Sequence, residues 1–480
     1  MINFFRKYFF ELMLVLIILG VLIFSFSTLT TKPRLWTDEG LSIELARDFL
    51  LYGKLDVVSS PGVFSDVPFL LQSTGYPMTI MLAVFFKIFG FGLVQARLFA
   101  LALMIILLIL VYWFTKKQFG KTNALLAVFL IATFAPFYGN GRCITGEILG
   151  FIFLLFGLNY FLDRRRLWLG GLFLGLAVMT KPSVYLLIIP AVLIVLLIEK
   201  RQFFFQAFKL LTGMLPAAFL WIIICLPSFF DTKSWLSIIN FYRNPFYPLS
   251  TVDNFFANLK FIPQSTTLIY FFILGGLVLW AFFCRQKTEE KDKRFLHFVI
   301  IYSALAFVYF LKSPGWLRYL IAVQFLIFIL LPEAVKRLTK LSIFNCSHFF
   351  DSKKIFYIVI FCLIILQAVQ LLFWADLFYS TASIDAINFL NQQGSDKTVG
   401  LVNSLEISGL ILSEKKYQLI DTLLGLPVIG QDFLAFELSR LPELVVSGPD
   451  EVTLNRHQDI IVEFYKLIFD NGRYYVYARK

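Results

Sequence analysis

Residues that bind metals or form disulfides are rare in this sequence. It has five cysteines and three histidines among 480 residues. The cysteines are an odd number without CxxC spacing, so neither a disulfide framework nor a zinc site is indicated. The histidines fit no metal-ligand or Ser/His/Asp pattern. We therefore predict no bound metal and no cofactor.

Nucleotide-binding motifs and charged residues are also scarce. The sequence has no Walker loop and no GxGxxG motif, which leaves a soluble nucleotide without a recognisable binding loop. Charged residues make up 15% of the chain and hydrophobic residues 59%. No class of soluble protein has this balance. The composition therefore predicts a membrane protein with many spans.

The net charge of +12 raises the question of nucleic-acid binding. The basic residues, however, lie in short clusters between apolar runs, as in the cytoplasmic loops of membrane proteins, because Lys and Arg resist translocation. The clusters are Arg6-Lys7, Lys116-Lys117, Arg164-Arg165-Arg166, Lys200-Arg201, Lys291 to Arg294, Lys336-Arg337 and Lys353-Lys354. The charge therefore indicates membrane orientation, and we expect no nucleic acid as a partner.

Long apolar runs predict about eleven transmembrane helices. They lie near Phe9–Leu29, Gly92–Phe114, Asn123–Phe137, Glu147–Leu162, Leu167–Thr180, Val184–Ile198, Phe208–Leu226, Thr266–Phe283, Phe295–Leu311, Tyr319–Leu331 and Ile355–Trp374. The first run lacks a signal-peptide cleavage pattern and is interpreted as a retained anchor. Counting Tyr76–Phe89 as a span would place the later basic clusters outside, so we expect a helix in the outer interface there. With the N-terminus inside, an odd number of spans places the C-terminus outside.

The predicted fold is an all-α polytopic membrane bundle, residues 1–375, followed by a small soluble extracytoplasmic α/β domain, residues 376–480. The first outer loop, residues 30–91, should hold interfacial helices. One of them is expected to have Thr37 as its cap and to end at Gly53. Its wet side should carry an ion pair between Glu44 and Arg47.

Short elements are predicted in the C-terminal domain. Ala382–Leu390 has the pattern of a helix, and Thr398–Val402 and Leu444–Ser447 have that of strands. The dipeptide Asn471-Gly472 predicts a tight hairpin before a strand at Tyr474–Tyr477.

Ionisable residues gather at span ends on the predicted outer face. The first is the acidic pair in Trp36-Thr37-Asp38-Glu39-Gly40, and the others are Arg97, Arg142, Glu147, Lys181 and Arg318 with Tyr319. Charged groups at membrane depth are costly and usually face a cavity or a partner. Two simpler alternatives stay open. The acidic pair could do no more than complement a helix dipole, and the arginines could extend to lipid headgroups without binding a substrate.

Acids and bases on one face suit the transfer of a group from a lipid-linked phosphate. A phosphodiester leaving group departs without a proton and needs cations such as Lys181 and Arg318. The acceptor loses a proton, for which Asp38 is the candidate general base. Glu39 or Glu147 could stabilise an oxocarbenium-like transition state, as carboxylates do in glycosidases.

At these motifs the sequence resembles the C-type glycosyltransferases that use polyprenyl-phosphate sugars, especially protein O-mannosyltransferases and bacterial aminoarabinose transferases. The resemblance covers residues 1 to about 330 and rests on the first acidic motif, Gly75-Tyr76-Pro77, Arg97, Arg142 to Glu147, and Gly175 to Pro182. It implies that Asp38 is the base, that Glu147 takes the place of a second-loop Asp, and that Lys181 and Arg318-Tyr319 match family positions.

The sequence departs from this family at the segment from Ser73 to Met78, where some relatives have a Lys-Pro-Pro element that contacts the donor phosphate. That contact would come from elsewhere or from Tyr76, although an aromatic residue at this depth is also a common interfacial anchor. The full set of candidate donor-phosphate residues is Lys181, Arg318, Tyr319, Arg97, Arg142 and Tyr76. A divalent metal is possible in this superfamily, but the acids here lack a convincing coordination set.

The sequence thus predicts an integral membrane glycosyltransferase of a bacterial cell membrane, with its active site on the extracytoplasmic side. It would transfer a sugar, with inversion, from a polyprenyl-phosphate donor to a lipid, glycan or protein acceptor. The alternative is a transporter or flippase of a lipid-linked or anionic solute, which would be expected to show two symmetric halves that the sequence lacks. A polymerase or ligase of surface polysaccharide would share the donor chemistry. The sugar and the acceptor are left open.

Overall fold

The computed structural model describes most of the chain. The described residues are 2–60, 62–64, 74–164, 166–200, 202–225, 235–236, 239, 251–283, 290–339, 352–394, 397–402, 404–411, 416–420, 441–448 and 461–480. The second predicted outer loop, Pro227–Ser265, lies largely outside these ranges. Its described part holds helix α14 (Thr251–Phe261).

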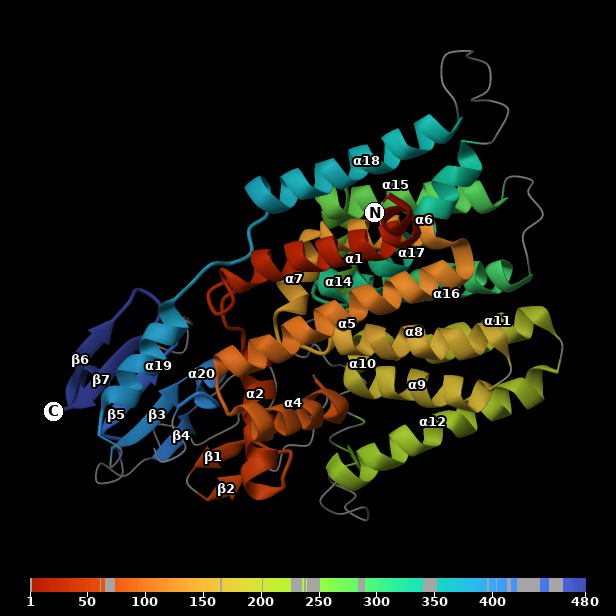
Figure 1. Ribbon diagram of the computed structural model, residues 1–480. Helices are drawn as coiled ribbons and strands as arrows, with labels where there is room; N and C mark the ends of the chain where they lie inside the picture. The colour runs from red at the N-terminus through yellow and green to blue at the C-terminus, as the bar shows by residue number, and fades with distance from the viewer. Residues whose placement is uncertain are drawn as a thin grey trace.

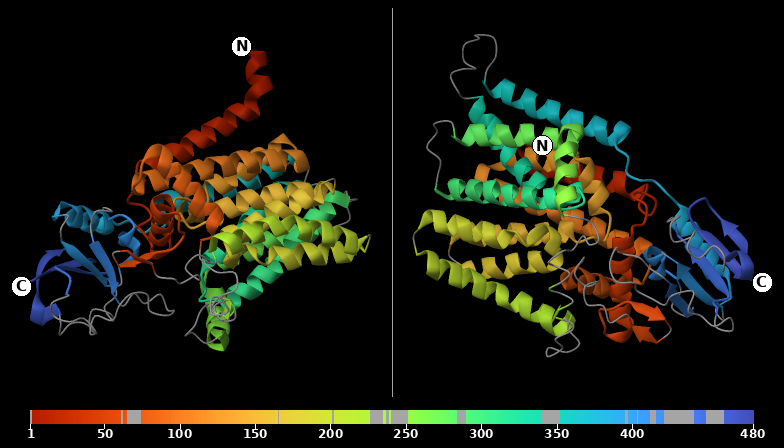
Figure 2. Two further views of the ribbon diagram at one scale, coloured as in Figure 1. Left: turned by 90° about the horizontal axis from the view of Figure 1, so that it is seen from below. Right: turned by 180° about the vertical axis from the view of Figure 1, so that it is seen from behind.

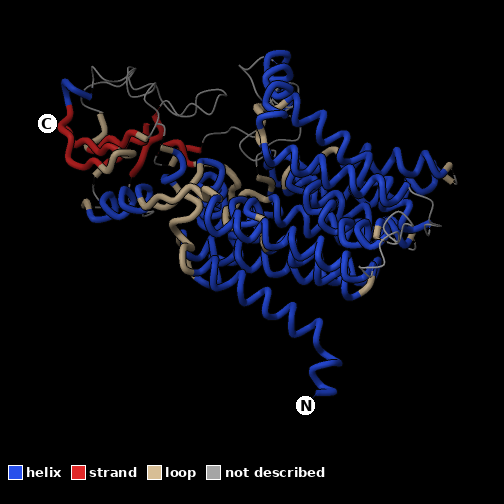
Figure 3. Tube along the Cα trace, turned by 90° about the horizontal axis from the view of Figure 1, so that it is seen from above, coloured by secondary structure: helices blue, strands red, loops and turns tan. Residues whose placement is uncertain are grey.

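Long helices lie side by side in a bundle, with a small mixed domain at one end of it (Figure 1). The helices of the bundle are α1 (Ile2–Phe26), α5 (Leu93–Phe119), α6 (Lys121–Ala132), α7 (Ala135–Gly141), α8 (Glu147–Asp163), α9 (Leu167–Thr180), α10 (Pro182–Tyr185), α11 (Ile188–Glu199), α12 (Phe203–Cys225), α15 (Thr266–Phe283), α16 (Glu290–Lys312), α17 (Ile321–Leu338) and α18 (Ser352–Val369). All strands lie at or beyond the same end of the bundle (Figure 3).

Every predicted span contains helix, but the helices differ in length. Within the described ranges, eight are long and apolar enough to cross a membrane, or nine if the bent pair α6 and α7 counts as one span. The axes of that pair differ by 67°. Helix α8 has 17 residues and α9 only 14, which is short for the roughly 20 residues of a full crossing. A multi-pass membrane protein is therefore clear, whereas the number eleven stays a prediction.

The ends of α5, α8 and α17 and the starts of α16 and α18, which carry or adjoin basic residues, lie at the end of the bundle away from the C-terminal domain (Figures 1 and 2). Ion pairs join the helix ends there: Arg294 contacts Glu199 at 2.6 Å, Arg164 contacts the same glutamate, and Lys121 contacts Glu11 at 3.1 Å. The structure thus separates a basic end from an end that carries the predicted outer loops. This arrangement is the one that the positive-inside rule requires of the predicted orientation.

The first loop contains α2 (Thr37–Tyr52), β1 (Val58–Ser60), β2 (Val63–Phe64) and α4 (Tyr76–Phe89). Helix α4 covers the segment predicted as interfacial and has 14 residues. Helix α2 ends at Gly53, as predicted, in the left-handed conformation with φ 69°. Two details of α2 were predicted wrongly. First, the N-cap is Trp36 and not Thr37, and it makes no side-chain hydrogen bond. Second, residues 39–48 are buried between α4 and the C-terminal domain, so Glu44 and Arg47 form their ion pair away from water.

The C-terminal segment forms a five-stranded sheet in the order β4-β3-β5-β7-β6. Strand β3 (Thr398–Val402) is parallel to β4 (Lys416–Ile420) and β5 (Leu444–Ser447), while β7 (Tyr475–Arg479) is antiparallel to β5 and β6 (Tyr465–Asp470). The predicted helix and strands coincide with α19 (Ala382–Gln392), β3 and β5, and Gly472 turns the last hairpin with φ 76°. The short helix α20 (Leu405–Ser408) faces α2.

Candidate active site

Loops that are far apart in the sequence meet at the outer end of the bundle. The amide of Gly75 donates to the carbonyl of Thr180 at 2.9 Å, and the hydroxyl of Thr74 donates to the carbonyl of Thr145 at 3.3 Å. A Cβ atom at Gly75 would lie 1.7 Å from the carbonyl oxygen of Met179, so only glycine allows this approach. The start of α4, the start of α8 and the end of α9 are therefore held together.

Asp38 and Arg318 form an ion pair at this meeting point. The carboxylate Oδ2 lies 2.9 Å from a terminal guanidinium nitrogen, and the side chains are 29% and 25% exposed. Burial raises the pKa of Asp38, but the charges of Arg318 and Lys181 outweigh it and hold the pKa below its ordinary value. Asp38 is therefore ionised at neutral pH, in the form that can accept a proton.

The loop before Arg318 is fixed by Asn258, which the sequence did not single out. The Asn258 amide donates to the carbonyls of Phe310, Leu311 and Ser313 at 3.2, 3.0 and 2.6 Å. These carbonyls end α16, just before the turn η2 (Leu317–Leu320) that carries Arg318. Nothing in the sequence around Asn258 signals this contact across some 50 positions.

Lys181 lies between α9 and α10 and is 2% exposed. Its charge interacts with those of Glu147, Asp38 and Arg318, so the structure brings these candidates together in one cluster. Among the described residues its ammonium group donates no hydrogen bond. A buried cation with unused donors is suited to an anionic ligand.

Glu147 is the first residue of α8 and is fully buried. Its backbone carbonyl accepts a hydrogen bond from the hydroxyl of Tyr185. Both of its carboxylate oxygens, in contrast, are buried without a hydrogen-bond partner among the described residues. Because buried acceptors in folded proteins are normally paired, this carboxylate is available to a bound ligand.

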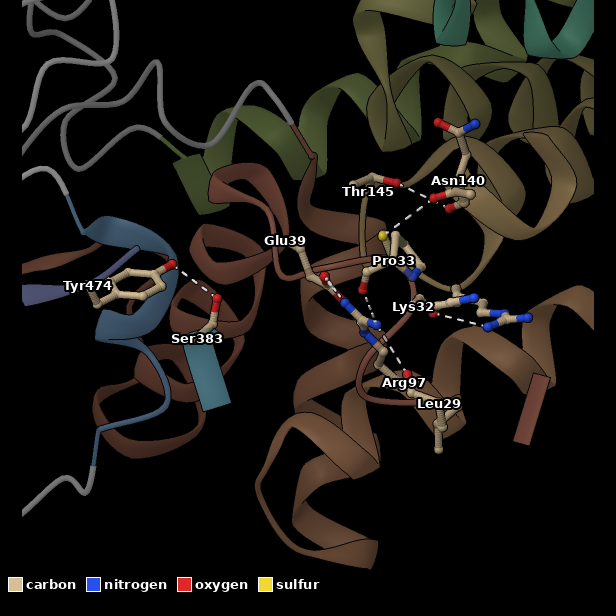
Figure 4. Close-up of polar contacts among 12 residues, drawn as sticks. Leu29, Lys32, Pro33, Glu39, Arg97, Asn140, Thr145, Ser383 and Tyr474 are labelled. Carbon is tan, nitrogen blue, oxygen red and sulfur yellow. Dashed lines mark hydrogen bonds and ion pairs between the residues drawn. The ribbon is translucent and has the colours of Figure 1, made fainter. Parts of the chain in front are cut away.

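Glu39 and Arg97 form a separate, fully buried ion pair, shown in Figure 4. The guanidinium group donates to both carboxylate oxygens, at 2.9 and 2.7 Å. It also donates to the carbonyls of Leu29 and Pro33, at 3.1 and 2.7 Å. With 0% exposure, Arg97 ties the end of the first span to α2 and presents no surface to a ligand.

Arg142 has a similar structural environment. Its guanidinium group donates to the hydroxyl of Thr28 at 2.8 Å and to the carbonyls of Lys32 and Phe24. The side chain is 0% exposed and lies over aromatic rings. Arg142 therefore fixes the exit of the first span.

The aromatic candidates are also held by the protein. The hydroxyl of Tyr76 donates to the carbonyl of Ala217 in α12 at 3.1 Å. The ring of Tyr319 packs against those of Trp316 and Tyr309, with centroids 5.6 Å apart in both pairs. The structure thus brings together Asp38, Glu147, Lys181 and Arg318, with Tyr319 beside them. Glu39, Arg97, Arg142 and Tyr76 lie in the contacts that support this cluster.

The cluster contains carboxylates and cations but few possible metal ligands. Within the described ranges, no group of three or more His, Cys, Asp or Glu side chains is placed to hold a metal ion. The carboxylate of Asp38 is paired with a guanidinium group. The two cations of the cluster suit a phosphate, and the carboxylate of Asp38 suits a neighbouring group that gives up a proton.

A protein-family model, Dolichyl-phosphate-mannose-protein mannosyltransferase, matches residues 77–228. No match is found among curated proteins. Among solved structures, the fold is similar to that of ArnT from Cupriavidus metallidurans bound to undecaprenyl phosphate, with TM-score 0.63, 15% identity and 97% of each chain covered. The apo form of the same protein matches with TM-score 0.61 and 14% identity over 97% of each chain.

The oligosaccharyltransferase of Archaeoglobus fulgidus, tethered to an acceptor peptide, matches with TM-score 0.51 and 13% identity. That match covers 100% of this chain and 75% of the other. The similarities place the chain in the GT-C fold, a class of membrane glycosyltransferases. The chain is accordingly a glycosyltransferase that resembles protein O-mannosyltransferases and ArnT, as the sequence motifs predicted.

Proposed function

We propose that this protein transfers a sugar from a polyprenyl-phosphate donor to a hydroxyl or amine of a lipid, glycan or protein acceptor, with inversion at the sugar. The observation that carries the proposal is the contact of Asp38 with Arg318 next to Lys181. It puts a proton acceptor within reach of the cations that suit a phosphate.

The donor phosphate binds to Arg318 and Lys181 in this proposal. Both cations lie in one cluster, and a guanidinium group can hold two phosphate oxygens at once. The match to a structure of ArnT with undecaprenyl phosphate supports this class of donor. Neutralising the phosphate stabilises it as the leaving group, which departs without taking up a proton.

The acceptor is activated by Asp38. The acceptor oxygen or nitrogen attacks the anomeric carbon of the sugar, the bond from that carbon to the phosphate oxygen breaks, and the acceptor proton passes to Asp38. Attack on the face opposite the leaving group inverts the anomeric centre. Arg318 exchanges its contact with Asp38 for the phosphate when the donor binds, which frees the carboxylate for this step.

Glu147 binds the sugar in this arrangement. Its two unpaired carboxylate oxygens can accept hydrogen bonds from sugar hydroxyls and stabilise positive charge at the ring during transfer. Glu39, in contrast, orients α2 through Arg97 and does not touch substrate.

The bacterial cell membrane and the extracytoplasmic side are part of the same proposal. The basic ends of the helices support it, because they lie opposite the cluster of Asp38 and Lys181. Donor lipid would enter between helices with its phosphate at the outer surface.

The test is Asp38→Asn in the purified protein, supplied with a polyprenyl-phosphate sugar and candidate acceptors. We expect the rate of sugar transfer to fall about a hundredfold or more, the usual contribution of a general base, while the donor still binds. Asp385→Asn is the control, since Asp385 is an exposed residue of α19. Near-normal transfer by the Asp38 variant would refute its role as the base.

The transporter alternative makes a different prediction for the same preparation. Sealed vesicles would move the lipid-linked solute without forming a covalent product. The family match and the GT-C fold favour the transferase, and a glycosylated product in detergent, where transport has no meaning, would decide between the two.

A further inference from the structure

Helix α2, which carries Asp38, is enclosed between the membrane bundle and the C-terminal domain. On the bundle side, Glu39 is bound by Arg97 of α5. On the other side, α20 and the residue after it pack on α2 with backbone against backbone. The position of Asp38 therefore depends on both contacts.

Glycines on both elements allow this close packing. A Cβ atom at Gly40 of α2 would lie 2.2 Å from the carbonyl oxygen of Glu406. A Cβ atom at Gly409 would lie 2.9 Å from the backbone nitrogen of Glu44. Any side chain at either position would push the two elements apart, and Gly40 is two residues from Asp38.

Buried polar contacts fix the register of the two elements. The hydroxyl of Ser408 donates to the carboxylate of Glu44, across 364 positions of the chain. Arg47 donates to the carbonyls of Ser408 and Gly409, at 3.3 and 3.1 Å. These groups are buried, so each contact is costly to break.

The C-terminal domain holds α20 equally firmly. The hydroxyl of Tyr474, beside strand β7, donates to the carboxylate of Glu406 at 2.6 Å. It also lies 3.0 Å from the hydroxyl of Ser383 in α19, as Figure 4 shows. The tyrosine is fully buried. Displacement of α20 would therefore break a buried contact with the residue that precedes β7.

We infer that α20 is a positioning element for sugar transfer: Gly40, Ser408 and Gly409 fix α2 so that Asp38 meets Arg318. The inference rests on the proposed function for its catalytic part. Arg318 belongs to a different element, the turn η2 before α17, so a shift of α2 separates the two groups without moving the cation. The C-terminal domain thus acts on the reaction through its contact with α2.

The test compares two variants of this contact with two matched controls. Gly40→Ala forces α2 and α20 apart, and Ser408→Ala removes the hydroxyl that contacts the carboxylate of Glu44 and the carbonyl of Leu405, with little change in shape. Gly20→Ala is the control for a glycine substitution within a helix, because a Cβ atom there has no neighbour within 4 Å. Tyr465→Phe is the control for the C-terminal domain, since it removes a buried hydrogen bond to Pro442 on the side of the sheet away from α2.

Hydrogen–deuterium exchange of α2 and the pH dependence of kcat/KM are the measurements. In Gly40→Ala, and to a smaller extent in Ser408→Ala, we expect faster exchange in α2 and a fall in kcat of about a hundredfold, the effect that a displacement of about 1 Å can have. The acid limb of kcat/KM should move to higher pH, since Asp38 loses Arg318 while keeping its burial beside Lys181 and Glu147. A mere loss of folded protein would lower the rate without moving the limb.

Both controls should keep the exchange of α2 and the acid limb of the unmodified protein. Unchanged exchange and an unchanged limb in both Gly40→Ala and Ser408→Ala would overturn the inference. If the unmodified protein transfers no sugar from any polyprenyl-phosphate donor, the proposed function fails instead, and the exchange of α2 alone decides whether α20 positions this helix.

Discussion

Glu39 and Arg97 form a two-point ion pair in which neither side chain is exposed, although the neighbouring Asp38 is partly exposed and contacts Arg318. Successive residues of a helix point about 100° apart, so adjacent carboxylates face different surroundings. Glu39 is used for structure, and we propose that Asp38 is used for chemistry. The sequence motif alone does not distinguish them.

The buried pair predicts a large loss of stability when one partner is removed. Arg97→Met leaves the Glu39 carboxylate uncompensated in the interior, which costs about 3–5 kcal/mol. We expect a clear fall in the thermal unfolding midpoint, measured in detergent. The double variant Glu39→Leu with Arg97→Met should recover part of this loss, because no charge then stays buried.

Lys121→Met is the matched control, since it removes an exposed pair with Glu11. Such pairs contribute about 0–1 kcal/mol, so its midpoint should hardly change. Equal midpoints for the Arg97 and Lys121 variants would contradict the assigned role of the buried pair.

The pH dependence of transfer should report the Asp38–Arg318 contact. A base must be deprotonated, and the attraction of Arg318 and Lys181 holds the pKa of Asp38 below its ordinary 3.8 against the effect of burial. The rate is therefore retained as the pH falls and is lost only as the pH passes below the lowered pKa. In Arg318→Gln, one of the two charges that lower the pKa of Asp38 is gone, so burial should raise this pKa. The acid limb of kcat/KM should then move to higher pH.

The position of the limb, and not the absolute rate, is the test, since Arg318→Gln also weakens phosphate binding. Arg479→Gln serves as the control, because Arg479 contacts the carbonyl of Leu441 within the C-terminal domain. An acid limb that stays in place in Arg318→Gln would mean that this cation does not control the base.

Glu147 should distinguish the sugar-bearing donor from the bare lipid phosphate. Glu147→Gln removes a negative charge near Lys181, so polyprenyl phosphate should bind as tightly as before or more tightly. The polyprenyl-phosphate sugar should lose a hydrogen bond to a charged group, about 1.5–3 kcal/mol, or roughly tenfold to a hundredfold in affinity.

Direct binding of the two lipids measures this ratio, with Glu443→Gln in the C-terminal domain as the control. If the ratio of the two affinities is the same in Glu147→Gln and the unmodified protein, Glu147 does not contact the sugar.

Sugar transfer should persist after treatment with a chelator. The proposed step uses Arg318 and Lys181 for the phosphate and Asp38 for the proton, and it assigns no role to a metal ion. The rate should be the same before and after removal of divalent ions, and again after Mg²⁺ or Mn²⁺ is added back. A loss that added metal restores would show that the acids bind an ion.

Local patterns predicted the elements of this fold well. Apolar runs identified the helices of the bundle, Gly53 marked the end of α2, and Asn471-Gly472 marked the last hairpin, because each depends on neighbours in sequence. The motifs also singled out Asp38 and Lys181, which the structure brings into one cluster, while their roles stay predictions. The predicted span Leu167–Thr180 has the same bounds as α9.

These local patterns could not predict contacts between residues that are distant in the sequence. Arg97 was expected at the phosphate, but it lies against Glu39, 58 positions away. Glu44 and Arg47 were expected to face water because their spacing shows only that they share a helix face, not what covers it. The element that covers this helix face is α20, and no property of residues 37–52 predicts it.

The contact between α2 and α20 also orders events during biosynthesis. Ser408 and Glu44 lie 364 positions apart, so the ribosome completes most of the chain before the helix with Asp38 meets its final neighbour. A chain that stops before residue 405 already has its acids and cations but not the surface against which α2 packs. In the proposed function and membrane orientation, completion of translation, and passage of the last segment across the membrane, thereby become conditions for consuming the lipid donor.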